Sequence, residues 1–245
     1  MTRRRWIADR WDEQSATLVG AQAAHLARVL RAQAGMQADV VAGGRVFHAV
    51  VQSATPEEVM FTLGEELAAE PPLPVTLVVS IYKFDRMEWA IEKATELGVA
   101  TIAPVVAQRT EKHLAQSAAK RVERWRRIAH EAAQQSRRAD VPEILDPAPL
   151  GARIKAEAAE DVRRIVLAEQ ERTNSLRAAV EAAVQEAGNE RPQLEIAIGP
   201  EGGWSSQEEA LFDAQGWKAV TLGPRILRAE TAALTALSVV AAWMD

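Results

Sequence analysis

The sequence predicts an α/β protein in which a C-terminal domain on a mostly parallel sheet follows a small β-barrel-like domain. Three observations support this fold class. A proline cluster at 70–74 divides the chain of 245 residues. Short β-like segments precede the cluster, and apolar strands alternate with helical stretches after it. Because prolines continue neither a helix nor a central strand, we place the domain boundary there, with domains at 1–72 and 73–245.

The N-terminal domain contains short segments rich in β-branched and apolar residues, which is the composition of strands. The pair Gly43-Gly44 separates two of these segments and indicates a hairpin. The stretch 21–31 has apolar residues at helical spacing and predicts one short helix. The predicted strands are 3–8, 38–43, 45–53 and 58–64.

The C-terminal domain contains near-continuous apolar runs, the pattern of strands buried on both faces. The predicted strands are 75–82, 99–107, 163–169, 194–198 and 218–222. Helical stretches separate them, and the clearest is 85–98, with an apolar stripe, Asp85 as N-cap and Gly98 as C-cap. This alternation builds a parallel sheet, whose ligand site lies at the carboxyl ends of its strands.

Composition excludes several classes of protein. The chain has no cysteine, which excludes disulfides and thiolate metal sites. Its four histidines lack the spacing of metal ligands, so we expect no metal. No apolar run reaches the roughly 20 residues of a membrane helix, and no apolar core follows the basic N-terminus. We therefore expect a cytoplasmic protein without a secretory signal or membrane contact.

Two loops of the C-terminal domain share one plan: strand, Gly-Pro, turn, helix. The first is 194-LEIAIGPEGGWSSQEE-209, and the second is 220-VTLGPRILRAETAALTAL-237. A loop that binds nucleotide phosphates carries a lysine after its last glycine, where this chain has Trp204. Neither loop matches the Walker A or dinucleotide pattern, which argues against a phosphate site. Two such loops can hold one small molecule between them; the alternative, that both are only tight turns, stays open.

The second loop places two arginines directly before the last predicted helix. Arg225 and Arg228 oppose the dipole of that helix, and no structural benefit offsets this cost. Their position favours contact with an anionic substrate. Glu230 and Thr231 follow, and both also suit a helix N-terminus as capping or dipole-stabilising residues.

Basic residues cluster although the net charge of the chain is −5. The stretch 109–138 carries nine Lys or Arg and three Asp or Glu. Most of it, 114–138, predicts one amphipathic helix with a basic face. A second cluster lies near the N-terminus: Arg3, Arg4, Arg5 and Arg10. One basic helix is more often a solvated face, but two clusters favour contacts to the phosphates of nucleic acid.

The two loops resemble the paired C-terminal motifs of the ribosomal RNA small subunit methyltransferase E family, which belongs to the SPOUT class of methyltransferases. Further matching motifs fall in order along nearly the whole chain: 25-HLARVLR-31, Lys83, 91-IEKATELGV-99 and 134-QQSRRADVPEI-144. The sequence departs from the pattern at Gln134, where the family often has Glu. The departure puts an acidic role at that position in doubt.

The resemblance implies an N-terminal PUA-like barrel and a C-terminal α/β domain with a deep trefoil knot. It implies methyl transfer from S-adenosylmethionine to N3 of one uridine in 16S, or small-subunit, ribosomal RNA. Family members are typically homodimers with the cofactor pocket near the dimer interface. Two readings compete with this one: a non-catalytic RNA-binding or ribosome-assembly protein, and a nucleotide-binding enzyme, against which the missing phosphate motifs count.

The resemblance also implies functional residues. The cofactor pocket would be formed by Leu167, Ala168, Glu169, Ile198, Gly199, Glu201, Gly202, Gly203, Leu222, Gly223, Ile226, Leu227 and Arg228. In catalysis, Arg228 would stabilise negative charge on the uracil ring, Glu230 would act as base, and Thr231 would orient the reactants. The contacts to RNA would come from Arg3, Arg4, Arg5, Arg28, Arg31, Lys83, Arg109, Arg124, Arg127 and Arg138.

Overall fold

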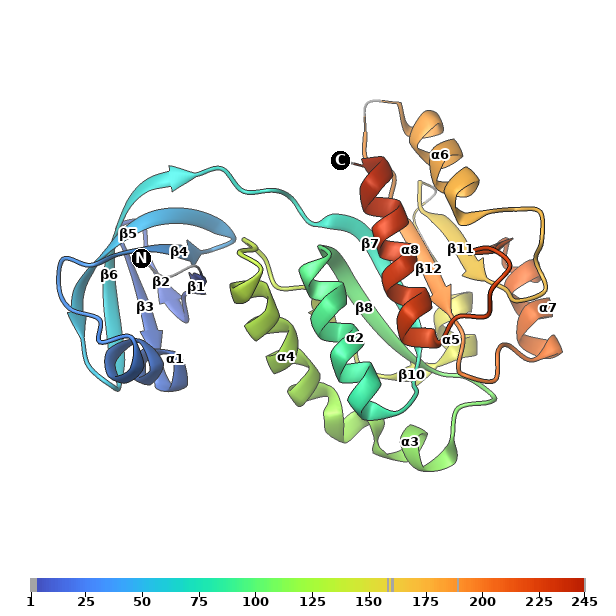
Figure 1. Cartoon of the computed structure of the whole chain (residues 1–245), viewed down its shortest axis with the longest axis horizontal. Coiled ribbons are helices and arrows are strands. Elements are labelled where there is room, and N and C mark those ends of the chain that lie inside the picture. The colour runs from blue at the N-terminus through green and yellow to red at the C-terminus, as the bar shows by residue number, and fades with distance from the viewer. Residues whose placement is uncertain (1–3, 158, 160, 189, 245) are drawn as a thin grey trace. The chain divides into compact units, whose positions relative to one another are not determined.

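The chain forms two compact units in a computed structural model, which describes residues 4–157, 159, 161–188 and 190–244 (Figure 1). One unit comprises Met1–Pro71 and Glu131–Val141, and the other comprises Pro72–His130 and Pro142–Asp245. The first junction falls within the proline cluster at which the sequence places its boundary. The segment 131–141 belongs to the first unit, a division that local sequence patterns do not predict because it depends on contacts between distant segments.

The N-terminal unit contains a curled six-stranded sheet with the order β1-β4-β5-β6-β3-β2. Its strands are β1 (Arg5–Ile7), β2 (Arg10–Trp11), β3 (Ser15–Val19), β4 (Gln37–Ala42), β5 (Arg45–Ala54) and β6 (Glu58–Leu67). Gly43 and Gly44 join β4 to β5 with φ values of 59° and 77°, so the predicted hairpin is confirmed. The sheet encloses a core that includes Trp6, Leu18 and Phe61.

Two features of this unit differ from the sequence prediction. The prediction missed β2 and β3, because β3 alternates buried and half-exposed residues over only five positions. The helix expected at 21–31 consists of α1 (Gly20–Ala24) followed by a π-helical turn (His25–Val29). The chain then leaves the turn at Arg31 with a φ of 53°, a conformation that few residues other than glycine adopt.

Polar contacts attach the segment 131–141 to the rest of the N-terminal unit. Arg137 donates to Asp39 Oδ2 at 2.6 Å, and Arg5 Nη1 donates to the Arg137 carbonyl at 2.5 Å. Gln134 donates through Nε2 to Gln22 Oε1 at 2.5 Å. The amide that replaces the family's common Glu therefore has a structural partner, to which a carboxylate could not donate a proton.

The C-terminal unit is built on a parallel sheet with the order β10-β8-β7-β12-β11-β13, and β9 pairs with β8. Its strands are β7 (Leu73–Ser80), β8 (Val99–Val106), β9 (Glu143–Ile144), β10 (Ala148–Pro149), β11 (Arg163–Leu167), β12 (Leu194–Ile198) and β13 (Lys218–Val220). The five predicted strands are confirmed. Because β12, β11 and β13 are neighbours, their carboxyl ends lie side by side.

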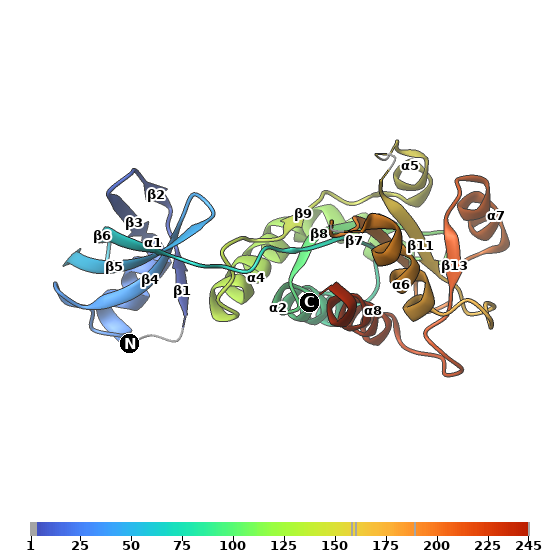
Figure 2. The same ribbon diagram turned by 90° about the horizontal axis from the view of Figure 1, so that it is seen from above.

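Helices cover both faces of this sheet (Figure 2). One face carries α2 (Phe84–Glu96), α6 (Leu176–Ala187) and α8 (Ala229–Met244), and the other carries α5 (Leu150–Lys155) and α7 (Ser206–Ala214). The apolar stripe predicted for the first helix is buried at Met87, Ala90, Ile91 and Ala94. Two-sided cover explains why the strands read as continuous apolar runs.

The prediction of one continuous basic helix over 114–138 was wrong, because the helix is interrupted. The structure has α3 (Lys112–Ser117), a 3₁₀ turn (Ala118–Arg121) and α4 (Val122–Gln135). Short 3₁₀ turns commonly join helices, because their tighter winding redirects the chain. The predicted apolar face nevertheless holds, since its five residues are buried: Ala118, Val122, Trp125, Ala129 and Ala132.

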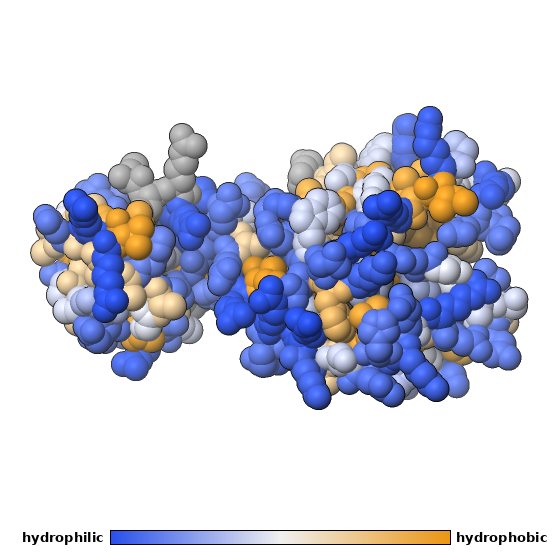
Figure 3. Space-filling view, turned by 60° about the horizontal axis from the view of Figure 1, so that its bottom comes forward, coloured by the Kyte–Doolittle hydropathy of each residue, from blue (hydrophilic) through white to orange (hydrophobic). Residues whose placement is uncertain are grey.

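The surface seen in Figure 3 is mostly hydrophilic, with separate apolar patches. Two large apolar side chains of the C-terminal unit are notably exposed, Trp89 at 46% and Ile226 at 84%. Among the residues that the structure describes, no helix combines the length and apolarity needed to cross a membrane.

Candidate functional site

The loop between β12 and α7 is a tight turn fixed by its own backbone. Gly203 donates its N–H to the Pro200 carbonyl at 2.8 Å and adopts a φ of 69°. A side chain at this position would be strained, which explains the glycine. The turn places Glu201 and Gly202 at the carboxyl end of the strand.

The Trp204 side chain attaches this loop to the neighbouring strand β11. Its indole Nε1 donates to the Leu167 carbonyl at the end of β11, at 3.0 Å. The ring is buried and packs edge-on against Phe212 of α7, with centroids 4.9 Å apart. A Cβ on Gly199 would lie 3.3 Å from the indole, so glycine permits this close approach. The residue that replaces a phosphate-loop lysine is therefore part of the core.

A capping box starts α7 directly after the loop. The Ser205 side chain accepts from the Glu208 N–H, and Glu208 accepts from the Ser205 N–H at 2.8 Å. Of the two serines that the sequence indicated, Ser205 is the cap. Glu208 also accepts from the Gln108 N–H at 2.7 Å, which links the cap to the turn after β8.

Arg109, from the same turn after β8, also binds the loop. Its Nη1 donates to the Gly202 and Trp204 carbonyls, the latter at 3.1 Å. A Cβ on Gly202 would lie 3.3 Å from Arg109 Cδ, so the glycine leaves room for this arginine. Sequence reasoning assigned Arg109 to RNA, whereas the structure shows its guanidinium bound to the loop.

The second loop, between β13 and α8, meets a third segment that follows β11. The Thr221 N–H donates to the Asn174 carbonyl at 2.8 Å, and the Leu176 N–H donates to the Thr221 carbonyl at 2.9 Å. Gly223 adopts a φ of 113°. Past this point the loop is open, and Ile226 projects into solvent.

Glu171 organises the third segment. Its carboxylate accepts N–H groups of Thr173 and Asn174 at 2.7 and 2.9 Å and the Thr173 hydroxyl at 2.7 Å. These hydrogen bonds, those from the backbone first, lower the pKa of Glu171 to about 2. The charged carboxylate therefore fixes the turn that leads from the cavity-lining residues after β11 to the start of α6.

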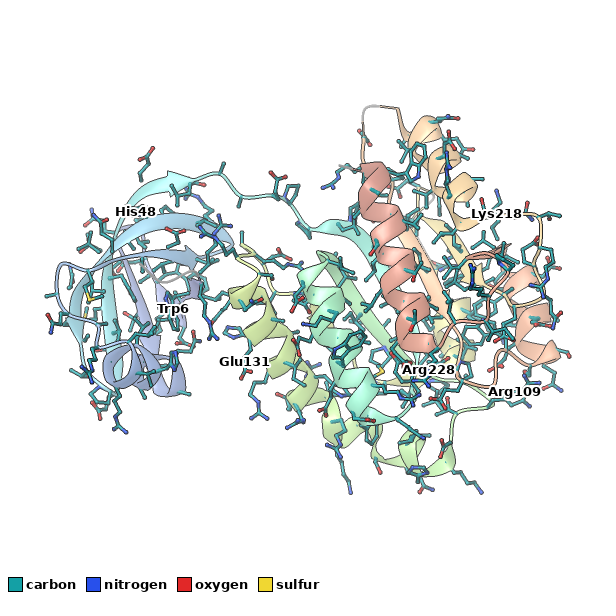
Figure 4. The ribbon with its side chains drawn as sticks, in the orientation of Figure 1. Trp6, His48, Arg109, Glu131, Lys218 and Arg228 are labelled. Carbon is teal, nitrogen blue, oxygen red and sulfur yellow. The ribbon has the colours of Figure 1, made fainter. Side chains whose placement is uncertain are left out.

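These three segments surround a cavity of about 410 Å³, within the size range of small-molecule sites. Figure 4 labels Arg109 and Arg228 at the end of the sheet where α8 begins. All thirteen candidate cofactor residues line this cavity: Leu167, Ala168, Glu169, Ile198, Gly199, Glu201, Gly202, Gly203, Leu222, Gly223, Ile226, Leu227 and Arg228. The paired loops therefore enclose one space.

Charged side chains surround the cavity. Those that line it are Arg86, Arg109, Arg172, Arg225, Arg228, Glu169, Glu201 and Glu209. Arg172 donates to the Glu169 carbonyl at 2.5 Å. The side chains of Arg225 and Arg228 are exposed and have no hydrogen bond or ion pair to any other residue in the described part of the chain. These two cations are free to meet an anionic ligand.

The other two candidate catalytic residues lie outside the lining of the cavity. Glu230 is buried at the start of α8, with Oε1 at 3.8 Å from Arg86 Nε, and Thr231 is exposed. Sequence reasoning missed Arg86 and Arg172 as members of the site. Arg86 lies on α2, far from both motifs along the chain, so no local pattern connects it to them.

The candidate RNA contacts fall into two groups. Those that are exposed are Arg4, Arg28, Arg31, Lys83, Arg109, Arg124 and Arg127, of which Arg109 donates to the loop after β12 and Arg124 donates to Glu88 at 2.8 Å. Arg5 and Arg138 are half-buried, and the Arg138 side chain, 8% exposed, forms an ion pair with Asp140. Arg3 lies outside the described residues. In the described ranges no cluster of His, Asp and Glu could hold a metal ion.

Comparison with known proteins identifies the class to which this fold and its paired loops belong. The profile of the RNA methyltransferase domain matches residues 69–241. Ribosomal RNA small subunit methyltransferase E of Synechocystis sp. is 34% identical over 236 residues, which cover 95% of this chain and 75% of that protein. The protein of that name from Bacillus subtilis is 36% identical over 172 residues, 70% of this chain and 66% of its own length.

A solved structure agrees with these sequence matches. Ribosomal RNA small subunit methyltransferase E from Neisseria gonorrhoeae, bound to S-adenosyl methionine, superposes with a TM-score of 0.81 at 29% identity. The similarity covers 96% of this chain and 95% of that one. The chain therefore belongs to the ribosomal RNA small subunit methyltransferase E family of RNA methyltransferases.

Proposed function

We propose that this chain is an S-adenosylmethionine-dependent methyltransferase that methylates N3 of a uridine in small-subunit ribosomal RNA. The observation that carries the proposal is the convergence of both loops and the segment after β11 on one cavity. The S-adenosyl methionine in the Neisseria gonorrhoeae relative supports the choice of cofactor.

The chemistry of the cavity fits this cofactor. Gly199 and Leu222 of the two loops line it, and their backbone groups would meet an adenine edge. Glu169 supplies negative charge for an amino group or a sulfonium. Bound S-adenosylmethionine supplies an electrophilic methyl group on a positively charged sulfur. A cofactor without phosphates needs no phosphate-loop lysine, which agrees with Trp204 at that position.

Arg228 has the position that suits contact with the reacting base. Uridine N3 carries a proton, so the nucleophile is the ring that has lost it. A free guanidinium next to the ring oxygens stabilises that anion and lowers the pKa of N3. The proton passes to water at the open side of the cavity. We assign Glu230 no direct contact with the base, because its carboxylate is buried and faces Arg86.

We propose that the exposed basic residues bind RNA phosphates. In the N-terminal unit these are Arg4, Arg28 and Arg31, and in the C-terminal unit they are Lys83 and Arg127. Their exposure and the absence of protein ion pairs among the described residues support this role. Arg138 and Arg109 are less suited, since both guanidinium groups are already bound to the protein.

We further propose a homodimer that uses α8. Glu230 is the single charged residue among the described residues of this helix, and Leu234, Val239 and Trp243 are half-exposed at different positions around it. A helix that is apolar all round is normally covered on all sides. A second copy of the chain would supply the missing cover.

We also propose that the C-terminal segment is threaded as a deep trefoil knot. Two features support this: Thr221 is hydrogen-bonded to the segment at 174–176, and α8 then returns from the edge strand β13 to pack on β7 and β12. Threaded chains are very rare among known folds, so a knot would set this fold apart from most α/β domains. An experimental structure in which α8 reaches the sheet outside the loop 168–176 would refute it.

The direct test combines cofactor binding with product analysis. Calorimetry should detect S-adenosylmethionine, and the enzyme should transfer a tritiated methyl group to small ribosomal subunits from cells that lack it. Digestion of the RNA should yield 3-methyluridine. No heat at millimolar cofactor would reject the methyltransferase in favour of a non-catalytic RNA-binding protein. A different methylated nucleoside would reject only the uridine-N3 assignment.

A further inference from the structure

Arg86 joins two acidic side chains that come from the two motifs. It lies in the first turn of α2 and lines the cavity. Its Nη1 donates to Glu201 Oε1 at 2.6 Å, and its Nε lies 3.8 Å from Glu230 Oε1. Glu201 belongs to the loop after β12, and Glu230 to the N-terminus of α8. One guanidinium therefore bridges the two sides of the site.

The Glu230 end of this bridge is largely closed to water, whereas the Glu201 side chain is 42% exposed. The Glu230 side chain is 10% exposed, and the Arg86 side chain is 30% exposed. Glu230 Oε2 and the Tyr82 hydroxyl are buried without a hydrogen-bond partner among the residues described. Burial first, and then the charges of Glu230 and Glu201, raise the pKa of Tyr82. These groups thus share one region of reduced polarity, where charge–charge interactions are stronger than in water.

Local helix stability does not explain the position of Arg86. A cation in the first turn of a helix opposes the helix dipole. Two carboxylates that approach each other in a partly buried region repel unless a cation lies between them. Removal of Arg86 would leave Glu201 and Glu230 uncompensated, and the loop after β12 would move away from the start of α8.

We propose that Arg86 is a positioning residue that couples the two cofactor loops by sharing its guanidinium between Glu201 and Glu230. The bridge sets the separation of the loops and so the width of the cavity. The inference rests on the proposed function, since it describes how that same site is held ready for its cofactor. It also gives Glu201, which the resemblance placed in the cofactor pocket, a specific structural role there.

A double-mutant cycle on cofactor affinity tests the bridge. Arg86→Gln and Glu201→Gln should each raise the Kd for S-adenosylmethionine about tenfold, a typical size for coupling between sites. The double variant should be no weaker than Arg86→Gln alone, because both changes break one contact. Arg86→Lys should give an intermediate Kd, since a lysine reaches one carboxylate but cannot share a planar fork between two.

The kinetic readout separates positioning from general stability. The KM for S-adenosylmethionine should rise about tenfold in Arg86→Gln, while kcat at saturating cofactor changes less than threefold. Arg126→Gln is the matched control. Arg126 also bridges two carboxylates, Glu123 at 2.6 Å and Asp146 at 2.9 Å, but it does not line the cavity. That variant should keep the wild-type Kd.

Distinct results contradict the two proposals. If the wild-type chain binds no S-adenosylmethionine, the proposed function fails and the bridge fails with it. If the wild type binds and both Arg86→Gln and Glu201→Gln bind equally well, only the bridge is refuted. Additive losses in the double variant would also refute it. Glu201 lies on an exposed turn, so the Glu201→Gln variant should fold. It therefore gives a result even if Arg86→Gln fails to fold.

Discussion

At the scale of single residues, the site depends on side chains that hold backbone rather than ligand. Trp204 ties one loop to β11, Arg109 holds the carbonyls of the same loop, and Glu171 fixes the turn below. Such contacts keep loop amides and carbonyls in place before a ligand arrives, which reduces the entropy lost on binding. Arg228 differs from these residues, because its guanidinium has no partner in the described residues.

The free guanidinium of Arg228 leads to a first prediction. Arg228→Ala should lower kcat for methyl transfer about 100-fold, the effect of removing one donor that stabilises a developing negative charge. The Kd for S-adenosylmethionine should change less than threefold. Rapid-quench methyl transfer and calorimetry measure the two quantities. Full activity in this variant would remove Arg228 from the reaction.

The hydrogen-bonded carboxylate of Glu171 leads to a prediction about pH. Its pKa in the folded chain is about 2, below the ordinary 4.5, so ionised Glu171 stabilises the turn. That contribution is complete above about pH 4.5 and is lost as the pH falls toward 2. The amide shifts of Thr173 and Asn174 should follow this titration in nuclear magnetic resonance spectra. Glu171→Gln should abolish the titration; an unchanged curve would contradict the assignment.

At the scale of elements, the capping box of α7 also makes a contact with a segment far away along the chain. Ser205 and Glu208 form a capping box that the sequence indicates by itself. The structure adds that Glu208 also receives the Gln108 N–H from the turn after β8. One helix cap thus joins the loop after β12 to a turn about a hundred residues earlier.

The cap gives a prediction about stability. Ser205→Ala should lower the free energy of unfolding by about 1 kcal/mol, the usual effect of losing an N-cap side chain. Ser206→Ala is the matched control, since Ser206 is exposed and makes no capping hydrogen bond; it should stay within about 0.5 kcal/mol of the wild type. Urea denaturation measures both. Equal losses in the two variants would contradict the cap assignment.

At the scale of the whole molecule, the half-exposed apolar residues of α8, such as Leu234, predict self-association. Leu234→Glu should convert the proposed dimer to a monomer in sedimentation velocity, because a charge at a covered apolar surface is strongly unfavourable. Circular dichroism should show that the helices are retained. Val29→Glu, at an exposed apolar residue of the N-terminal unit, should leave the dimer intact. A wild type that sediments as a monomer at all concentrations would refute the proposal.

Much of the architecture follows from local patterns. Apolar runs predicted the five main strands of the parallel sheet, the Gly43-Gly44 pair predicted its hairpin, and the paired Gly-Pro loops predicted a common site. These signals work because each depends on a few neighbouring residues: alternation, helical spacing, or a positive φ that glycine allows. The strand β3 was missed because its alternating pattern covers only five positions.

The sequence by itself determined the alternation of strands and helices that builds the parallel sheet, and the two Gly-Pro loops whose residues line one cavity. Only the tertiary structure decided which side chains outside the motifs complete it. Arg86 binds the carboxylate of Glu201, and Arg109 binds the carbonyl of Gly202. In both pairs the two residues lie more than ninety positions apart along the chain. A periodic pattern of residues in the sequence cannot reveal such pairs, because the order of strands in the sheet brings them together. The same reason explains why no sequence pattern pairs Glu230 with Arg86: packing of α8 brings its carboxylate to 3.8 Å from the Arg86 Nε.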